Sequence, residues 1–239
     1  MNALRLRHGI GRIAQGLRGL RRDASGIAMV EFAICLPFVV TATMAGTELA
    51  NYTTTKMRIS QLALMVADNA SRIGSGTMNA KTISETQIND LLTGAGLQSG
   101  RLDLFRNGRV ILASLQPSST PNKYVVQWQR CRGLMSATPS HYTVTNSTNL
   151  TLPVTGDMNG ITANNRLITA PSTGAVMFVE ISYTYQPLIN MGFLPGVDPT
   201  IKDIAALTVR DNRDYAGGTN GIYNAENATR SLCTQFSAT

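Results

Sequence analysis

The chain has 239 residues, of which 43% are hydrophobic and 15% are charged. This length and composition exclude a small disulfide-rich scaffold and a chain that is disordered throughout. The formal net charge is +7, but six arginines and one aspartate lie in the first 25 residues, so that short segment alone carries +5. The remaining +2 provides no broad basic surface, and we therefore expect no nucleic-acid partner.

One long apolar segment follows the basic one. Residues 27–50 are almost all apolar or small, and Glu31 and Glu48 are their only charged residues. The segment is about as long as a bilayer requires, although its uncharged part is shorter than the ~20 residues usual for a spanning helix. Glu31 is therefore expected at the membrane edge or inside the membrane, where a carboxylate needs a neutralising partner. The preceding arginines predict a cytoplasmic N-terminus and place residues 51–239 outside.

Three interpretations of this segment remain open from these features. It can be an uncleaved signal anchor, or a secretory signal peptide cut near residues 43–45, although a basic region of about 26 residues is long for a signal peptide. The third interpretation starts from the order of a basic leader, Gly26, four residues, Glu31 and Phe32. This order is the layout of a type IV prepilin cleavage site.

Residues 24–33 (ASGIAMVEFA) and the Leu-Pro pair that ends at Pro37 resemble the start of TadE-type pseudopilins of the tight-adherence (Tad/Flp) pilus system. The resemblance implies that a prepilin peptidase cuts between Gly26 and Ile27, which makes Glu31 the fifth residue of the processed chain. Glycine suits such a site because, without a Cβ, it lets the peptidase approach a backbone that is not yet helical.

The resemblance also gives roles to the residues that follow the cleavage site. The freed amine of Ile27, in the same or a neighbouring subunit, is the natural counter-charge for Glu31, which together with Phe32 would set the register of subunits during assembly. The alternative is that Glu31 simply reaches the membrane interface, where the helix dipole favours an anion. Pro37 removes one helical hydrogen bond and is expected to kink the helix.

The function implied by the resemblance is that of a minor pilin that initiates, caps or anchors a tight-adherence pilus. Such a chain lies in the bacterial inner membrane with its C-terminal part in the periplasm, or enters the extracellular fibre. Its partners are the prepilin peptidase, other pilins and pseudopilins through the N-terminal helix, and the assembly platform in the inner membrane. The alternative function is an uncleaved, signal-anchored periplasmic domain that binds or adheres.

We expect no enzymatic activity, cofactor or metal. The chain has two histidines, His8 and His141, and neither has a Cys or acidic cluster near it in the sequence. A metal site of His and Cys ligands is therefore not expected. The sequence has no Walker loop, zincin motif or nucleophile elbow. The chain is thus predicted to act by packing.

The apolar helix is expected to continue outward. Residues 51–73 contain no Pro or Gly and repeat apolar residues at helical spacing, so they extend the helix to roughly 70 Å before a Gly-Ser-Gly triplet ends it. The chain is therefore divided into a basic cytoplasmic leader (1–26), a transmembrane and projecting helix (27–74) and a periplasmic α+β head (75–239).

The head is predicted to be a mainly antiparallel sheet with one short helix. A capping-box pattern at residues 84–87 starts this helix, and Gly94 and Gly96 are expected to end it. Asn107 and Gly108 are a strong hairpin signal between two expected strands. The strands of this hairpin are predicted at residues 102–105 and 109–112, and three more at residues 123–130, 175–186 and 201–210.

Two segments of the head are too polar for regular structure. Residues 136–165 are predicted to be a Ser/Thr/Asn-rich loop with one short strand near residues 150–152, and residues 211–239 form a polar tail. Cys131 follows a predicted strand and Cys233 lies in the tail, so in an oxidising compartment we expect a disulfide between them, with two free buried thiols as the alternative. Such a bond could contribute up to ~4–5 kcal/mol.

Overall fold

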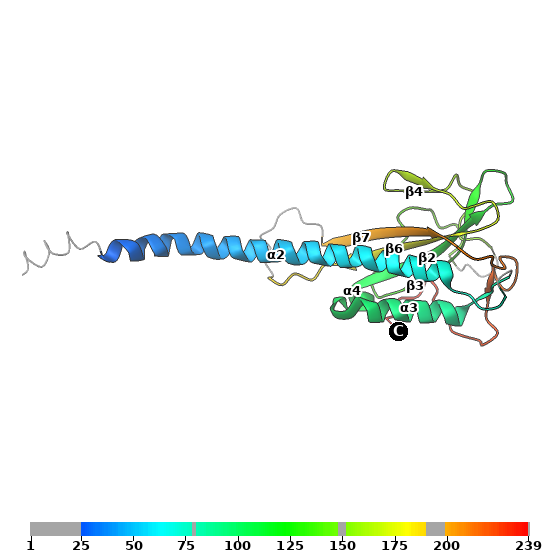
Figure 1. The fold of residues 1–239 in the computed structure, drawn as a ribbon, viewed down its shortest axis with the longest axis horizontal. Coiled ribbons are helices and arrows are strands. Elements are labelled where there is room, and N and C mark those ends of the chain that lie inside the picture. Colours follow the sequence, from blue (N-terminus) through cyan, green and yellow to red (C-terminus); the bar gives the residue numbers. More distant parts are fainter. Residues whose placement is uncertain (1–24, 78–79, 148–151, 190–198, 239) are drawn as a thin grey trace, which may run out of the picture. The chain divides into compact units, whose positions relative to one another are not determined.

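The computed structural model describes residues 25–77, 80–147, 152–189 and 199–238. The chain forms two compact units, Met1–Ala50 and Asn51–Thr239. Helix α2 (Ser25–Arg72) belongs to both units, and its described residues begin one position before Gly26 (Figure 1). Apart from Ser25 and Gly26, the predicted cytoplasmic leader lies outside the described residues.

The second unit is built on one four-stranded antiparallel sheet. Its strand order is β3-β2-β6-β7, and each neighbouring pair is antiparallel. The strands are β2 (Gly108–Pro117), β3 (Tyr124–Arg132), β6 (Val176–Thr184) and β7 (Thr200–Thr208). The predicted α+β class is confirmed, with a long N-terminal helix followed by an antiparallel sheet. The strands expected at residues 123–130, 175–186 and 201–210 correspond to β3, β6 and β7.

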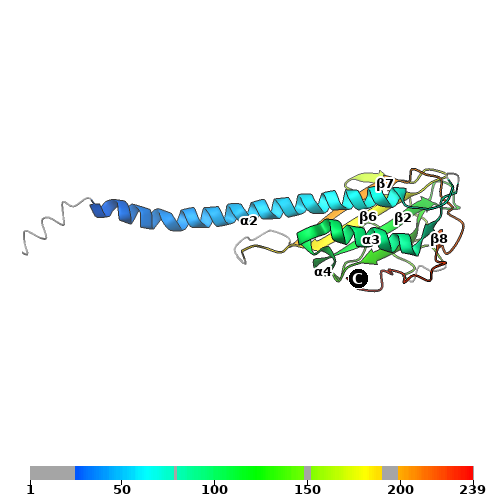
Figure 2. The ribbon, with the colours of Figure 1, turned by 60° about the horizontal axis from the view of Figure 1, so that its bottom comes forward.

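Helices cover one face of this sheet. The end of α2 and helix α3 (Glu85–Ser99) run side by side across the strands (Figure 2). Ile59, Leu62 and Val66 of α2 join the main core, which also contains Trp128 at 1% exposure. The prediction that Trp128 belongs to the core is thus confirmed. On the opposite face a second, smaller core is closed by loop segments and has Phe178 among its members.

The hairpin predicted at Asn107 and Gly108 is wrong. A 3-10 turn η1 (Gly100–Leu102) and a short helix α4 (Leu104–Asn107) precede β2, which begins at Gly108. The helix forms because it buries Leu104 and Phe105, which are 1% and 8% exposed. Gly108 is extended, and a Cβ there would lie 2.5 Å from the carbonyl oxygen of Ser182. This glycine therefore permits a close backbone approach and makes no turn.

Helix α3 is longer than predicted. The capping box is confirmed, because Ser84 Oγ accepts a hydrogen bond from Gln87 N at 3.2 Å and Gln87 Oε1 accepts one from Ser84 N at 3.1 Å. The helix then continues through Gly94 and Gly96 to Ser99. A Cβ at Gly96 would lie 2.6 Å from the ring of Phe105, so this glycine serves helix packing and does not end the helix.

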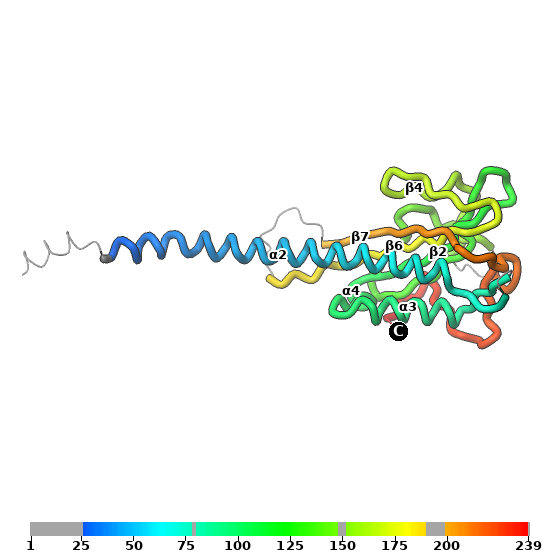
Figure 3. The backbone as a smooth tube through the Cα atoms, in the orientation of Figure 1, coloured from blue at the N-terminus to red at the C-terminus, as the bar shows by residue number. Residues whose placement is uncertain are grey.

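Short strands complete the head. Strand β1 (Ile83–Ser84) pairs in parallel with β8 (Ile222–Tyr223) of the tail, and β4 (Ile161–Ala163) pairs antiparallel with β5 (Arg166–Ile168). The predicted polar loop thus contains strand β4 and the predicted polar tail contains strand β8. Their polar composition gave no sign of either strand. The strand expected near residues 150–152 falls largely outside the described residues. The tail passes back beside α3 before the chain ends (Figure 3).

Candidate functional site

The first candidate site is the apolar half of α2, residues 26–50. Its large apolar side chains point outward: Phe32 is 65% exposed, Phe38 is 73% exposed and Met29 is 76% exposed. Within the described part of the chain, α2 is the helix long and apolar enough to cross a membrane. An apolar surface of this size on a described segment requires a partner, either lipid or other apolar helices.

The hydroxyl groups of this segment are satisfied within the helix. Thr41 Oγ1 donates to the carbonyl oxygen of Pro37 at 2.6 Å, and Thr43 Oγ1 donates to that of Val39 at 2.9 Å. Thr47 Oγ1 donates to the carbonyl oxygen of Thr43 at 2.8 Å. The helix continues through Pro37 without interruption. Because these donors need no water, the segment is suited to a lipid environment.

Glu31 is the charged exception near the start of this segment. Its side chain is exposed, and it lies four residues after Ile27, which places both residues on one side of the helix. The sequence from residue 27 to residue 50 contains no Lys, Arg or His. A positive charge for Glu31 must therefore come from a new chain terminus at Ile27 or from outside this segment.

The backbone around Gly26 differs from the expectation. We expected a segment that is not yet helical, but Gly26 and Ile27 are both helical residues of α2. Gly26 is exposed, and a Cβ there would meet no atom within 4 Å. Its place in this fold does not require glycine.

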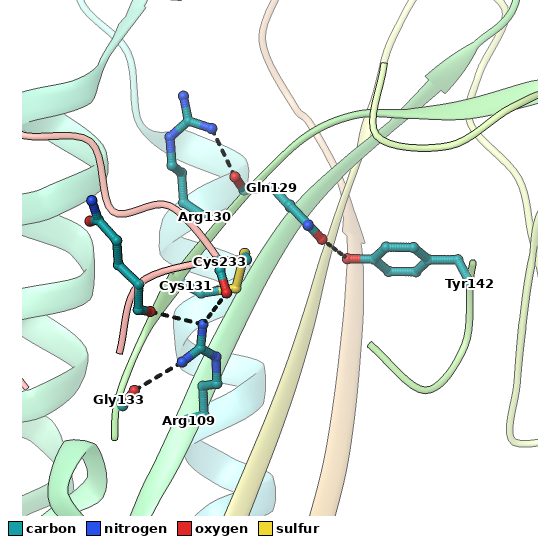
Figure 4. The surroundings of a disulfide bond; sticks show 8 residues. Arg109, Gln129, Arg130, Cys131, Gly133, Tyr142 and Cys233 are labelled. Atoms are coloured by element: carbon teal, nitrogen blue, oxygen red, sulfur yellow. Dashed lines mark hydrogen bonds between the residues drawn. A yellow bond between two sulfur atoms is a disulfide. The ribbon is translucent and has the colours of Figure 1, made fainter. Parts of the chain in front are cut away.

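The second candidate site surrounds a disulfide in the head (Figure 4). Cys131 of β3 and Cys233 of the tail are bonded, with their Cα atoms 4.7 Å apart. Beside them Arg109 is 1% exposed and donates from Nη1 to the carbonyl oxygen of Gly133 at 3.0 Å. Its Nη2 donates to the carbonyl oxygens of Cys233 and Gln235 at 2.7 and 3.1 Å. Burial lowers the pKa of the Arg109 guanidinium below its ordinary value.

A buried carboxylate lies on the neighbouring strand. Glu180 of β6 has no exposed surface and accepts hydrogen bonds from the backbone N–H and the hydroxyl of Ser140. Nearby, Tyr142 donates its hydroxyl to Gln129 Oε1 at 2.9 Å (Figure 4). Burial, and secondarily the charge of Glu180, raise the pKa of Tyr142 far above its ordinary value. Polar groups thus fasten irregular segments onto this face of the sheet.

The helix-covered face carries a buried ion pair. Arg130 of β3 and Glu85 of α3 are 1% exposed each and are joined by two hydrogen bonds, one of them from Arg130 Nε to Glu85 Oε2 at 2.9 Å. Breaking such a pair leaves a buried charge without a partner and is strongly destabilising. This pair therefore fixes the position of α3 on the sheet.

Sequence reasoning predicted both cysteines but missed the buried charges around them. Arg109 and Glu180 each stand inside a stretch that was predicted as a strand, and a charged residue in an apolar strand was the available signal. Among the described residues, no three His, Cys, Asp or Glu side chains gather as metal ligands would. The structure keeps Gly26, Ile27, Glu31, Phe32 and Pro37 on one helix, in a different unit from the disulfide.

The fold and these sites define a class of protein: an α+β chain with one N-terminal helix able to anchor it in a membrane. Residues 26–68 match the family described as TadE-like protein. This match confirms the predicted resemblance and associates the chain with the Tad pilus system. None of the curated proteins and none of the solved structures compared with the chain gave a match.

Proposed function

We propose that the chain is a minor pilin, or pseudopilin, that is required to initiate, cap or anchor a tight-adherence type IV pilus. The observation that carries this proposal is that the family match begins at Gly26, the glycine of the predicted cleavage site, and that the helical residues from Ile27 onward present exposed apolar side chains. A segment that starts with a cleavage motif and continues as an unpartnered apolar helix is suited to lateral packing with other such helices.

In this proposal a prepilin peptidase hydrolyses the peptide bond between Gly26 and Ile27. The products are the basic leader and a chain with a free amine at Ile27. That amine, in its own or an adjacent subunit, neutralises Glu31 in a membrane-like environment. The chain itself contributes packing and register and performs no catalysis. The peptidase, other pilins and the inner-membrane assembly platform are the proposed partners.

The proposed topology places the N-terminus in the cytoplasm and the second unit in the periplasm. Six arginines precede the apolar segment, whereas Lys56 and Arg58 are the basic residues that follow it closely. This asymmetry supports the orientation by the positive-inside rule. The Cys131–Cys233 disulfide also suits an oxidising compartment such as the periplasm.

The experiment that tests the proposal determines the N-terminal residue of the protein in cells with and without a prepilin peptidase. We expect Ile27 only when the peptidase is present. Gly26→Ala should retain the uncleaved chain, and Gly46→Ala is its matched control because a Cβ meets no atom within 4 Å at either glycine. Cleavage of the control but not of Gly26→Ala would locate the effect in recognition and not in folding.

Other N-termini would overturn this proposal in distinct ways. A start at Met1 under both conditions would identify an uncleaved, signal-anchored protein, and the alternative of a periplasmic binding or adhesive domain would replace the pilin role. A start near Gly46 would identify a secreted domain that has lost the apolar segment. Either result would separate residues 26–50 from pilus assembly.

A further inference from the structure

The tail segment, residues 229–238, closes part of the outer edge of strand β3. The backbone N–H of Cys131 donates to the carbonyl oxygen of Ser231 at 2.8 Å, and that of Gly133, just after the strand, donates to Ser237 at 2.7 Å. An edge strand with open N–H and C=O groups is a template for pairing with another chain. The tail segment therefore occupies backbone groups that a strand from elsewhere would otherwise use.

Apolar packing contributes little to this closure. The large apolar residues of the tail segment are Leu232, which is half-buried, and Phe236, which is 51% exposed. Polar contacts dominate instead: Asn89 Nδ2 of α3 donates to the carbonyl oxygen of Thr229 at 2.7 Å, and Ser231 Oγ donates to Asn89 Oδ1 at 2.7 Å. Neutral contacts of this kind exchange readily with water. The segment also has an ion pair between Arg230 Nε and Glu85 Oε1 at 3.5 Å, and the Phe236 ring lies 4.2 Å from the Arg109 guanidinium.

Two stronger anchors lie at the centre of the segment (Figure 4). One is the Cys131–Cys233 disulfide. The other is Arg109, whose buried guanidinium donates hydrogen bonds to two carbonyl oxygens of the tail segment, those of Cys233 and Gln235. Both anchors bind the tail segment between Cys233 and Gln235. Loss of the disulfide therefore also leaves the acceptors of Arg109 less firmly held. Without the tail segment Arg109 keeps the carbonyl oxygen of Gly133 but loses the two acceptors of Nη2, and a buried cation with too few acceptors favours any replacement that supplies them.

We propose that the Cys131–Cys233 disulfide is a redox lock on the edge of β3. With the bond formed, the tail segment closes the edge within its own chain; with both thiols reduced, the tail segment is released and the edge accepts the tail segment of a second copy. A second copy is the fitting occupant because it offers the same carbonyl oxygens to the same two N–H groups and to Arg109.

The chain before the tail segment provides the hinge for this exchange. Asn227, which lies between β8 and the tail segment, has a positive φ of 52°. Asn tolerates several backbone regions, so the chain can change direction there at low steric cost. The tail can thus be redirected without altering the sheet.

The lock needs an external oxidant to close and an external reductant to open. On closing, two thiols form one S–S bond and a disulfide oxidant takes up the two protons and two electrons as it becomes a dithiol; on opening, a dithiol reductant gives two protons and two electrons to the S–S bond and itself becomes a disulfide. Within one chain the two cysteines meet at high effective concentration, so the intrachain bond forms first when both are present. The proposal concerns the head and holds with or without a role in pilus assembly.

The test uses the full-length chain in detergent micelles. The third cysteine, Cys35 of α2, is free and exposed, so every variant carries Cys35→Ser. One copy carries Cys233→Ser and keeps Cys131, and a second copy with a larger tag carries Cys131→Ser and keeps Cys233. The two are mixed in reduced form, oxidised with glutathione disulfide and separated without reductant. We expect the mixed dimer to exceed each of the two identical-copy dimers by about tenfold or more, because only the Cys131–Cys233 pairing is templated. A statistical mixture of the three dimers, or monomers alone, would overturn the proposal.

A second measurement on the unaltered chain guards against misfolded variants. Hydrogen exchange of the Cys131 and Gly133 amides is compared before and after reduction, with central amides of β2 and β6 as the internal control. We expect faster exchange at the two edge amides and unchanged exchange in the central strands. Unchanged edge amides would mean that the disulfide does not hold the tail segment. Faster exchange throughout the sheet would mean that it stabilises the whole head and is not an edge lock.

Discussion

The two halves of helix α2 differ in how their apolar side chains are covered. In the first half, residues 26–50, Leu36 is 43% exposed; in the second half, residues 51–72, Leu62 is 3% exposed and Val66 is 1% exposed. The sheet of its own unit covers one face of the second half and buries the apolar residues there, whereas Met57, Leu64 and Met65 are 54%, 56% and 45% exposed. The first half presents most of its large apolar side chains on the surface, Met29, Phe32 and Phe38 among them. One helix therefore stabilises the head at one end and offers a surface for lipid or other helices at the other.

The largest expected effect comes from the one carboxylate near the start of the first half. Glu31→Gln keeps the size of the side chain and removes its charge, so it should abolish pilus assembly while leaving membrane insertion and the stability of the head unchanged. Assembly is measured as surface pili, and head stability by thermal unfolding in micelles. Met29→Gln is the control, because it places the same polar group on another exposed position of the same helix. Normal piliation of Glu31→Gln would contradict the pseudopilin role.

The next largest effect is a difference in unfolding free energy between two variants, each with one leucine replaced by alanine, one in each half of α2. Leu62→Ala removes a buried side chain and should lower the free energy of unfolding of the head by about 2–5 kcal/mol, through lost burial and the cavity left behind. Leu36→Ala, in the exposed half of the same helix, should leave that free energy unchanged. Chemical unfolding of the full chain in micelles measures both. Equal losses of unfolding free energy in the two variants would show that both halves of α2 belong to one cooperative core, and would contradict the difference in burial.

The fold was predictable where local signals and long-range packing agree. Residues 175–186 combine β-branched and aromatic residues, and β6 forms there as a central strand. Gly96 and Gly108 misled the prediction because a glycine signal has two physical meanings. Each was interpreted as a helix end or a turn, whereas each leaves room for a neighbour, the ring of Phe105 or the backbone of Ser182. The meaning of each glycine depends on which residue packs against it, and the sequence alone does not show that contact.

The candidate sites show the same division. Gly26, Ile27 and Glu31 are close in sequence, so a local pattern sufficed to mark them. The disulfide partners are 102 residues apart, yet the oxidising side assigned to both cysteines predicted their pairing. The partners of Arg109 could not be assigned from the sequence, because they are backbone carbonyl groups and a carbonyl group carries no sequence signal.

The smallest expected effect is a pH dependence confined to the head. Residues 26–50 contain no tyrosine, whereas half-buried Tyr142 has a pKa raised above its ordinary value of 10.0, first by burial and then by Glu180. The folded state therefore favours the neutral phenol, and the unfolded chain releases its proton near pH 10. Above that pH the folded state binds more protons than the unfolded state, so stability falls as pH rises, and below it the contribution is fully present.

Unfolding of the head between pH 8 and 11 measures this effect, and Tyr142→Phe identifies its source. The variant should lose about 1 kcal/mol at neutral pH with the hydrogen bond to Gln129, and its stability should then fall less steeply at high pH. Part of the slope should remain, because burial also raises the pKa of Tyr183. The helical signal of residues 26–50 should not change over this range. An equally steep fall in Tyr142→Phe would show that this phenol does not titrate with unfolding, and a loss of helix in the first half would show that alkaline sensitivity is not a property of the head alone.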